Sequence, residues 1–174
     1  GYFGTLNLNI DRDTGLLFDI AERLMREDPR FTFTLAGRIY GEAIPLRIKA
    51  MSEEFGERFS YLGEISMKDV VENAQRTHFG FLLIRPESPM FSESMPVSAN
   101  KVYEYLLAGT IPVIRAVIED RESVERCSLI FGKEATMENI VAEIRTLAGD
   151  VERMRRLMTE CREIGQRYSW EEVS

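Results

Sequence analysis

One stretch of the sequence holds a complete helix, its stop signal and the strand that follows: Ser98-Ala99-Asn100-Lys101-Val102-Tyr103-Glu104-Tyr105-Leu106-Leu107-Ala108-Gly109-Thr110-Ile111-Pro112-Val113-Ile114. Residues 98–108 are predicted to be helical, and Gly109 is a natural C-terminal stop because glycine readily adopts a left-handed backbone conformation. Residues 111–114 then form a short apolar strand. The nearest upstream strand, residues 78–84, is apolar almost throughout, as expected for a central parallel strand buried on both faces. This order of strand, helix and strand predicts a βαβ unit.

The same alternation of strands and helices continues along the rest of the chain. Further strands are predicted at residues 1–6, 31–36, 59–62 and 128–131, and further helices at residues 13–27, 44–55, 137–147 and 151–164. Another helix is expected to open at Ser66 with a capping box in which Asp69 replaces the usual glutamate. The fold class is therefore α/β: a three-layer, doubly wound Rossmann-like domain with a parallel sheet of about six strands. We expect residues 1–174 to form this single domain.

Composition and charge exclude several functional classes. A net charge of −7 argues against a nucleic-acid partner, and no apolar run is long enough for an integral membrane segment. The chain has one histidine, and its two cysteines lack metal-ligand spacing. We therefore expect no metal, and we expect reduced thiols in a cytoplasmic protein. Because no initiating methionine precedes Gly1, we also expect the chain to be a fragment of a longer protein.

The quoted helix is also the best candidate for a ligand site. In doubly wound sheets, ligands bind beyond the carboxyl ends of the strands, which here nominates residues 4–11, 37–41, 63–65, 85–101 and 116–119. Free backbone N–H groups at the start of the helix would point into this crevice and could hold a diphosphate, with Lys101 adding a positive charge. Glu104, one turn inside the helix, is placed to accept both hydroxyls of a ribose. A surface ion pair between Lys101 and Glu104 is the alternative role for both residues.

The motif Asn-Lys-x-x-Glu-Tyr-x-x-Ala-Gly-x-x-Pro-Val at residues 100–113 resembles the donor-site helix of GT-B retaining glycosyltransferases. The relatives in question are the glycosyl transferases group 1, or family 4-like, enzymes. Other features in the same order strengthen the resemblance over nearly the whole chain: Tyr2-Phe3-Gly4, Leu35-Ala36-Gly37, Tyr61-Leu62-Gly63 and Tyr168-Ser169-Trp170-Glu171. The chain thus looks like the C-terminal, donor nucleotide-sugar-binding domain of such an enzyme.

The resemblance implies a role for each matching position. Glu104 would bind the ribose, and the backbone amides of Ser98, Ala99, Asn100 and Lys101 would bind the diphosphate. Gly4 and Thr5 would line the phosphate and sugar end of the site, while the stretches around Arg38 and Leu62 would flank the base.

The resemblance also implies the reaction and its partners. It implies retaining transfer of a sugar from a nucleotide diphosphate sugar, without a cofactor or a required metal. The active site would lie in a cleft shared with an N-terminal acceptor domain that this chain lacks, so the isolated chain would be inactive. Peripheral membrane contact would be made, if at all, through that missing half.

Two departures from the family pattern bear on the donor sugar. Relatives often carry an earlier glutamate, separated by seven residues from the ribose-binding one; Pro96 stands there in this chain, and Glu93 is the nearest carboxylate. Relatives also carry an arginine and a lysine after the first strand, where this chain has only Arg12. These departures favour the alternative hypothesis, a non-catalytic Rossmann-like nucleotide-binding or interaction module.

Two further enzyme classes fit less well. A sugar-nucleotide epimerase would need acid–base residues that the sequence does not reveal, and a dinucleotide-dependent dehydrogenase would need a G-x-G-x-x-G pattern, which residues 4–7 lack.

Overall fold

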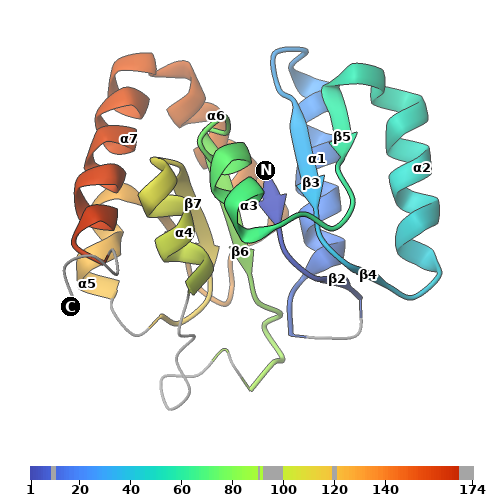
Figure 1. The fold of residues 1–174 in the computed structure, drawn as a ribbon, viewed down its shortest axis with the longest axis horizontal. Helices are drawn as coiled ribbons and strands as arrows, with labels where there is room; N and C mark the ends of the chain where they lie inside the picture. Colours follow the sequence, from blue (N-terminus) through green and yellow to red (C-terminus); the bar gives the residue numbers. More distant parts are fainter. Residues whose placement is uncertain (9–10, 90, 92–99, 119–120, 169–174) are drawn as a thin grey trace.

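The computed structural model describes residues 1–8, 11–89, 91, 100–118 and 121–168, and the predicted alternation of strands and helices is present in them (Figure 1). The strands are β1 (Tyr2–Phe3), β2 (Leu6–Asn7), β3 (Phe33–Ala36), β4 (Ile39–Tyr40), β5 (Phe59–Tyr61), β6 (Phe79–Leu83), β7 (Ile111–Arg115) and β8 (Leu129–Phe131). The α-helices are α1 (Thr14–Glu27), α2 (Ala43–Phe55), α3 (Met67–Ala74), α4 (Asn100–Ala108), α5 (Arg121–Val124), α6 (Met137–Gly149) and α7 (Val151–Gln166). Two 3-10 helices, η1 (Gly56–Arg58) and η2 (Glu125–Cys127), complete the described elements.

The strands pair in parallel, as predicted, but they are divided among small sheets. One sheet has the order β1-β3-β5, a second has the order β6-β7-β8, and β2 pairs with β4. Within the described residues no sheet has more than three strands, so the expectation of one sheet of about six strands is not met. The two larger sheets do meet, because the amino group of Gly1 donates a 2.7 Å hydrogen bond to the carbonyl of Phe79 in β6.

Residues 1–6 form two strands rather than the single predicted one. Tyr2 in β1 pairs with Leu35, and Leu6 in β2 pairs with Ile39. The two partners are therefore the same number of positions apart in the sequence in both ladders. The ladder is interrupted between them at Gly37, where φ is +141° and an added Cβ would lie 1.8 Å from the carbonyl oxygen of Gly4. The interruption is therefore a local bend that requires glycine.

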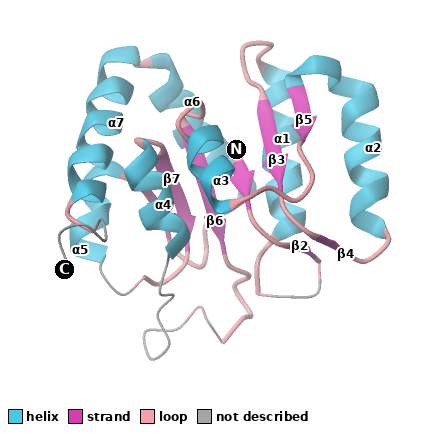
Figure 2. Ribbon diagram, viewed as in Figure 1, coloured by secondary structure: helices cyan, strands magenta, loops and turns pink. Residues whose placement is uncertain are grey.

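Helices cover both faces of the strands (Figure 2). In Figure 1, α3 and α4 lie in front of the central strands, and α1 lies behind β3. All residues of β6 and β7 are buried, as predicted for central parallel strands. A smaller apolar cluster joins β1 and β3 to the front helices; its members are Phe3, Ala36, Val70, Ala74, Tyr105 and Ala108. This cluster fixes α4 against the carboxyl end of β1.

The helix ends follow the predicted signals, with one difference. Gly109 stops α4 with φ +75°, and Ser66 caps α3 by accepting a 3.2 Å hydrogen bond from the backbone N–H of Asp69. The full capping box is not formed: the carboxylate of Asp69 accepts a hydrogen bond from the Ser66 hydroxyl at 2.7 Å, because aspartate is one methylene shorter than glutamate. In the described part of the chain, no helix is long and apolar enough to cross a membrane.

Candidate functional site

A cavity of about 270 Å³ lies at the carboxyl ends of β1 and β3, beside the start of α4. Ligands of doubly wound sheets bind beyond the carboxyl ends of the strands, which we call the strand-end rule. Four of the segments that this rule nominates contribute to the lining, through residues 4, 5, 37, 38, 40, 64, 65 and 101. Its full lining is Phe3, Gly4, Thr5, Ala36, Gly37, Arg38, Tyr40, Glu64, Ile65, Met67, Val70, Lys101 and Glu104. We call this the strand-end cavity.

The strand-end cavity brings together five of the nine candidate residues, namely Gly4, Thr5, Arg38, Lys101 and Glu104. Two others do not line it. Leu62 is 42% exposed beyond the end of β5, and Asn100 is exposed at the first described position of α4. The remaining two, Ser98 and Ala99, lie outside the described residues, as do Pro96 and Glu93.

Lys101 extends from α4 back to the end of β1. Its ammonium donates a hydrogen bond to the carbonyl of Phe3 and lies over two aromatic rings, 5.3 Å from the centroid of Tyr2 and 6.0 Å from that of Tyr105. Burial lowers the pKa of this ammonium; the charge of Glu104 opposes the shift and that of Arg12 adds to it. The ammonium has three donors; one of them bonds the Phe3 carbonyl, while the other two have no hydrogen-bond acceptor among the residues that the structure describes.

Glu104 lies one turn further along α4 and is partly exposed. The surface ion pair with Lys101 that the spacing permits is not formed, and within the described part of the chain Glu104 takes part in no ion pair. Its carboxylate therefore lines the cavity without a cationic partner there, and it can accept hydrogen bonds from a ligand.

The opposite wall of the cavity contains an exposed ion pair that the sequence did not reveal. The guanidinium of Arg38 donates to the carboxylate of Glu64, with a closest approach of 2.7 Å, and this hydrogen bond lowers the pKa of Glu64. Arg38 is thus paired rather than free. Tyr40 and Met67, exposed to 45% and 65%, add apolar surface to the same wall. This wall therefore combines an ion pair with apolar area, whereas Lys101 and Glu104 of α4 bring charged groups to the rest of the lining.

Arg12 lies outside the lining but close to Lys101. Its Nη1 atom is buried and has no hydrogen-bond partner among the described residues. The loop that carries Arg12 is fixed from the next position, where the carboxylate of Asp13 pairs with the buried guanidinium of Arg115 at the end of β7. Arg12 and Lys101 together therefore bring two positive charges to the carboxyl end of β1.

None of the described side chains forms a metal site of the usual kind: no group of three or more histidine, cysteine, aspartate or glutamate residues is placed to hold an ion.

Comparison by sequence finds no match: neither a protein-family model nor a curated protein matches this chain. Comparison by structure does. The C-terminal domain of the glycosyl transferase group 1 family protein LpcC from Francisella tularensis superposes with a TM-score of 0.75 at 10% identity, over 97% of this chain and 84% of that one.

Two longer proteins have the same fold over part of their length. Alr3699/HepE of Anabaena, in complex with UDP and glucose, has a TM-score of 0.66 at 16% identity, over 95% of this chain and 43% of that one. WaaG, a glycosyltransferase involved in lipopolysaccharide biosynthesis, has a TM-score of 0.69 at 12% identity, over 95% of this chain and 42% of that one. The chain therefore spans less than half the length of these two proteins.

These superpositions confirm the fold class implied by the motif at residues 100–113. The chain has the Rossmann-like fold of the C-terminal half of GT-B glycosyltransferases.

Proposed function

We propose that this chain is the donor-binding domain of a glycosyltransferase that moves a sugar from a nucleotide diphosphate sugar to an acceptor. The observation that carries the proposal is the strand-end cavity, where Gly4, Thr5 and Arg38 meet Lys101 and Glu104 of α4. At the carboxyl ends of parallel strands, the cavity combines a helix start, a half-buried ammonium and a carboxylate that forms no ion pair with a described residue. That combination suits a nucleotide diphosphate.

The diphosphate would lie against the start of α4. Helix N-termini favour anions because their first N–H groups lack partners within the helix. Among the described residues, Lys101 uses only one of its N–H donors, on the Phe3 carbonyl, and Arg12 supplies a second charge that forms no ion pair. Gly4 matters because a Cβ at this position would lie 2.7 Å from the ammonium nitrogen of Lys101. A side chain there would displace the cation from the strand end.

The nucleoside would occupy the rest of the cavity. Glu104 would accept hydrogen bonds from the two ribose hydroxyls, which a carboxylate can do with its two oxygens. The base would lie toward the wall formed by Tyr40, Met67 and the Arg38–Glu64 pair, where apolar area and polar groups are both present. Leu62, which the resemblance also assigns to the base, does not line the cavity.

The chemical contribution of this domain would be electrostatic. When the bond from the sugar to the diphosphate breaks, negative charge grows on the leaving phosphate oxygens. Lys101, Arg12 and the start of α4 would stabilise that charge from positions fixed before the reaction. We propose that transfer retains configuration without a required metal, in a cleft completed by an N-terminal acceptor domain of the same protein.

Calorimetry with UDP, GDP and ADP tests donor binding by the 174-residue chain. One of the three is expected to bind, and Lys101→Met is expected to weaken its binding about tenfold or more, because a hydrogen bond to a charged group contributes about 1.5–3 kcal/mol. Lys68→Met is the matched control, since Lys68 is an exposed lysine of α3 that does not line the cavity. If no diphosphate binds while the chain is folded, the proposal fails.

A non-catalytic nucleotide-binding module is the second candidate function. It is favoured by Pro96, which stands where the resemblance leads us to expect a sugar-contacting glutamate. Both candidates predict nucleotide binding, and only the first predicts that the full-length protein transfers sugar through Glu104.

A further inference from the structure

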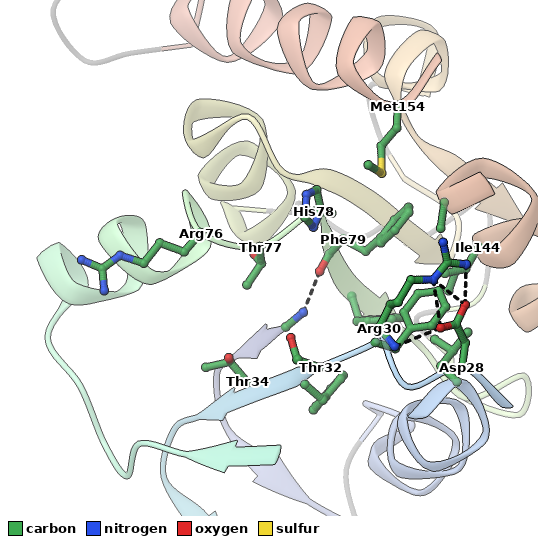
Figure 3. Close-up of a pocket in the computed structure, with 16 residues that line it drawn as sticks. Asp28, Arg30, Thr32, Thr34, Arg76, Thr77, His78, Phe79, Ile144 and Met154 are labelled. Carbon is green, nitrogen blue, oxygen red and sulfur yellow. Dashed lines mark hydrogen bonds and ion pairs between the residues drawn. The ribbon is translucent and has the colours of Figure 1, made fainter. Parts of the chain in front are cut away.

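Lys101 and Arg12 bring two positive charges to the carboxyl end of β1. Neither of them forms an ion pair within the described part of the chain. The arrangement differs in a cavity of about 290 Å³ at the amino ends of β3 and β6, where the guanidinium of Arg30 pairs with the carboxylate of Asp28 at 2.7 Å (Figure 3). Groups other than a carboxylate must therefore hold the ammonium of Lys101 in place.

Two aromatic rings provide this support. The ammonium nitrogen of Lys101 lies over the ring of Tyr2 in β1, 5.3 Å from its centroid, and over the ring of Tyr105 in α4, 6.0 Å from its centroid. The face of an aromatic ring carries partial negative charge and attracts a cation, more strongly where water is excluded. Both tyrosines are buried. The ammonium is therefore held by two ring faces and by the carbonyl of Phe3.

The hydroxyl of Tyr2 reaches the backbone that lines the strand-end cavity. It donates a 3.0 Å hydrogen bond to the carbonyl of Thr5, and a Cβ added at Gly4 would lie 3.3 Å from its oxygen. The same added Cβ would lie 2.7 Å from the ammonium nitrogen of Lys101. Tyr2 therefore contacts both the cation and the backbone of residues 4–5, against which the cation packs.

Tyr105 is fixed mainly by contacts that do not involve the cation. A Cβ added at Gly80 would lie 2.6 Å from its ring, and its hydroxyl donates to the carbonyl of Phe81 at 3.4 Å. The polar contact of Tyr2, in contrast, is made to a residue of the strand-end cavity. Tyr2 is therefore the ring whose contacts are directed toward the site.

The groups that face Lys101 come from β1, α4 and the loop before α1. Burial lowers the pKa of its ammonium, the charge of Glu104 in α4 raises this pKa, and the charge of Arg12 in the loop lowers it further. The hydroxyls of Tyr2 and Tyr105 stay neutral because burial raises their pKa. Their rings attract the ammonium through their faces, which offsets part of the cost of burying it.

We propose that Tyr2 is a positioning residue of the nucleotide site. Its ring holds the ammonium of Lys101 at the end of β1, and its hydroxyl fixes the carbonyl of Thr5 beside it. Tyr2 does not line the strand-end cavity, so it acts on a ligand through Lys101 rather than by contact. The role rests on the proposed nucleotide site, whereas the hold of the ring on the ammonium is measurable without a nucleotide.

Two variants of similar shape separate the charge distribution of the ring from its packing. Tyr2→Phe keeps the ring and removes the hydroxyl. The same variant with a pentafluorinated ring has a face that repels cations, because fluorine withdraws the electrons from it. Nuclear magnetic resonance of the Lys101 side chain follows its titration without nucleotide. Tyr2→Phe is expected to keep the pKa of Lys101, and the fluorinated ring is expected to lower it by about one, a tenfold loss of proton affinity.

Tyr61→Phe, with a plain and with a pentafluorinated ring, is the matched control. The hydroxyl of Tyr61 also donates to a backbone carbonyl at a strand end, that of Gly37 at 2.8 Å, but no cation lies over its ring among the described residues. Both control variants are expected to leave the pKa of Lys101 unchanged. An equal pKa of Lys101 in the fluorinated Tyr2 and Tyr61 variants would overturn the proposal.

Calorimetry with UDP, GDP and ADP measures the consequence for the site. The diphosphate that binds the parent chain is expected to bind the fluorinated Tyr2 variant about tenfold more weakly, and Tyr2→Phe at most about threefold more weakly, since the plain ring still holds the ammonium. Equal affinity for the parent chain and the fluorinated Tyr2 variant would overturn the role of Tyr2 alone. A parent chain that binds none of the three would overturn the proposed function itself.

Discussion

Replacing Glu104 with glutamine is expected to lower sugar transfer by the full-length protein about tenfold to hundredfold. The carboxylate lines the strand-end cavity and forms no ion pair with another described residue. Its charged hydrogen bonds to the ribose would contribute about 1.5–3 kcal/mol, and the isosteric amide can offer only one acceptor oxygen. Initial rates at donor concentrations below KM measure the loss.

The control for this variant is Glu72→Gln, an exposed glutamate of α3 that does not line the cavity. It is expected to leave transfer unchanged. The thermal midpoint of Glu104→Gln should stay close to that of the parent chain, which separates a ligand contact from a folding defect. Unchanged transfer in Glu104→Gln would contradict the ribose-binding role of Glu104, and a full-length parent protein that transfers no sugar would favour the non-catalytic module.

Replacing Gly37 with alanine is expected to destabilise the domain by about 2–5 kcal/mol. The backbone at Gly37 has φ +141°, and a Cβ there would lie 1.8 Å from the carbonyl oxygen of Gly4. An unfavourable φ costs about 1–3 kcal/mol, and forcing extra volume into a packed site costs about as much again. Because Gly4 and Gly37 both line the strand-end cavity, the shift that relieves the clash also deforms this cavity.

Gly41 provides the matched comparison for Gly37. It also has a positive φ, +89°, but a Cβ there would meet nothing within 4 Å. Gly41→Ala therefore carries the backbone cost without the clash, and it is expected to be the milder variant with nucleotide binding preserved. Urea unfolding of both variants measures the difference. Equal destabilisation would show that the close approach of Gly37 to Gly4 contributes nothing.

Much of the fold follows from local patterns that the sequence displays directly. The apolar run at residues 78–84 and the stop at Gly109 depend on residues adjacent in the chain, and both are found as predicted. The division of residues 1–6 into β1 and β2, by contrast, does not follow from a local pattern. It depends on the contact between Gly4 and Gly37, which lie far apart in the sequence, and no periodicity within residues 1–6 signals it.

The candidate site divides in the same way. The strand-end rule and the motif at residues 100–113 predicted the place of the cavity and most of its polar residues. The partners of those residues were not predictable, because each pair joins separate elements: Arg38 with Glu64, and Lys101 with the carbonyl of Phe3. Leu62 was nominated by the resemblance as part of a stretch that flanks the base, and it is not among the residues that line the cavity.

Nuclear magnetic resonance of the isotope-labelled 174-residue chain, titrated with UDP, GDP and ADP, tests the nucleotide site most directly. The diphosphate that binds is expected to shift the amide signals of Gly4, Thr5, Gly37, Arg38 and Lys101, which surround the strand-end cavity. Shifts confined to residues that do not line this cavity, or no shift with any of the three nucleotides, would contradict the proposed site.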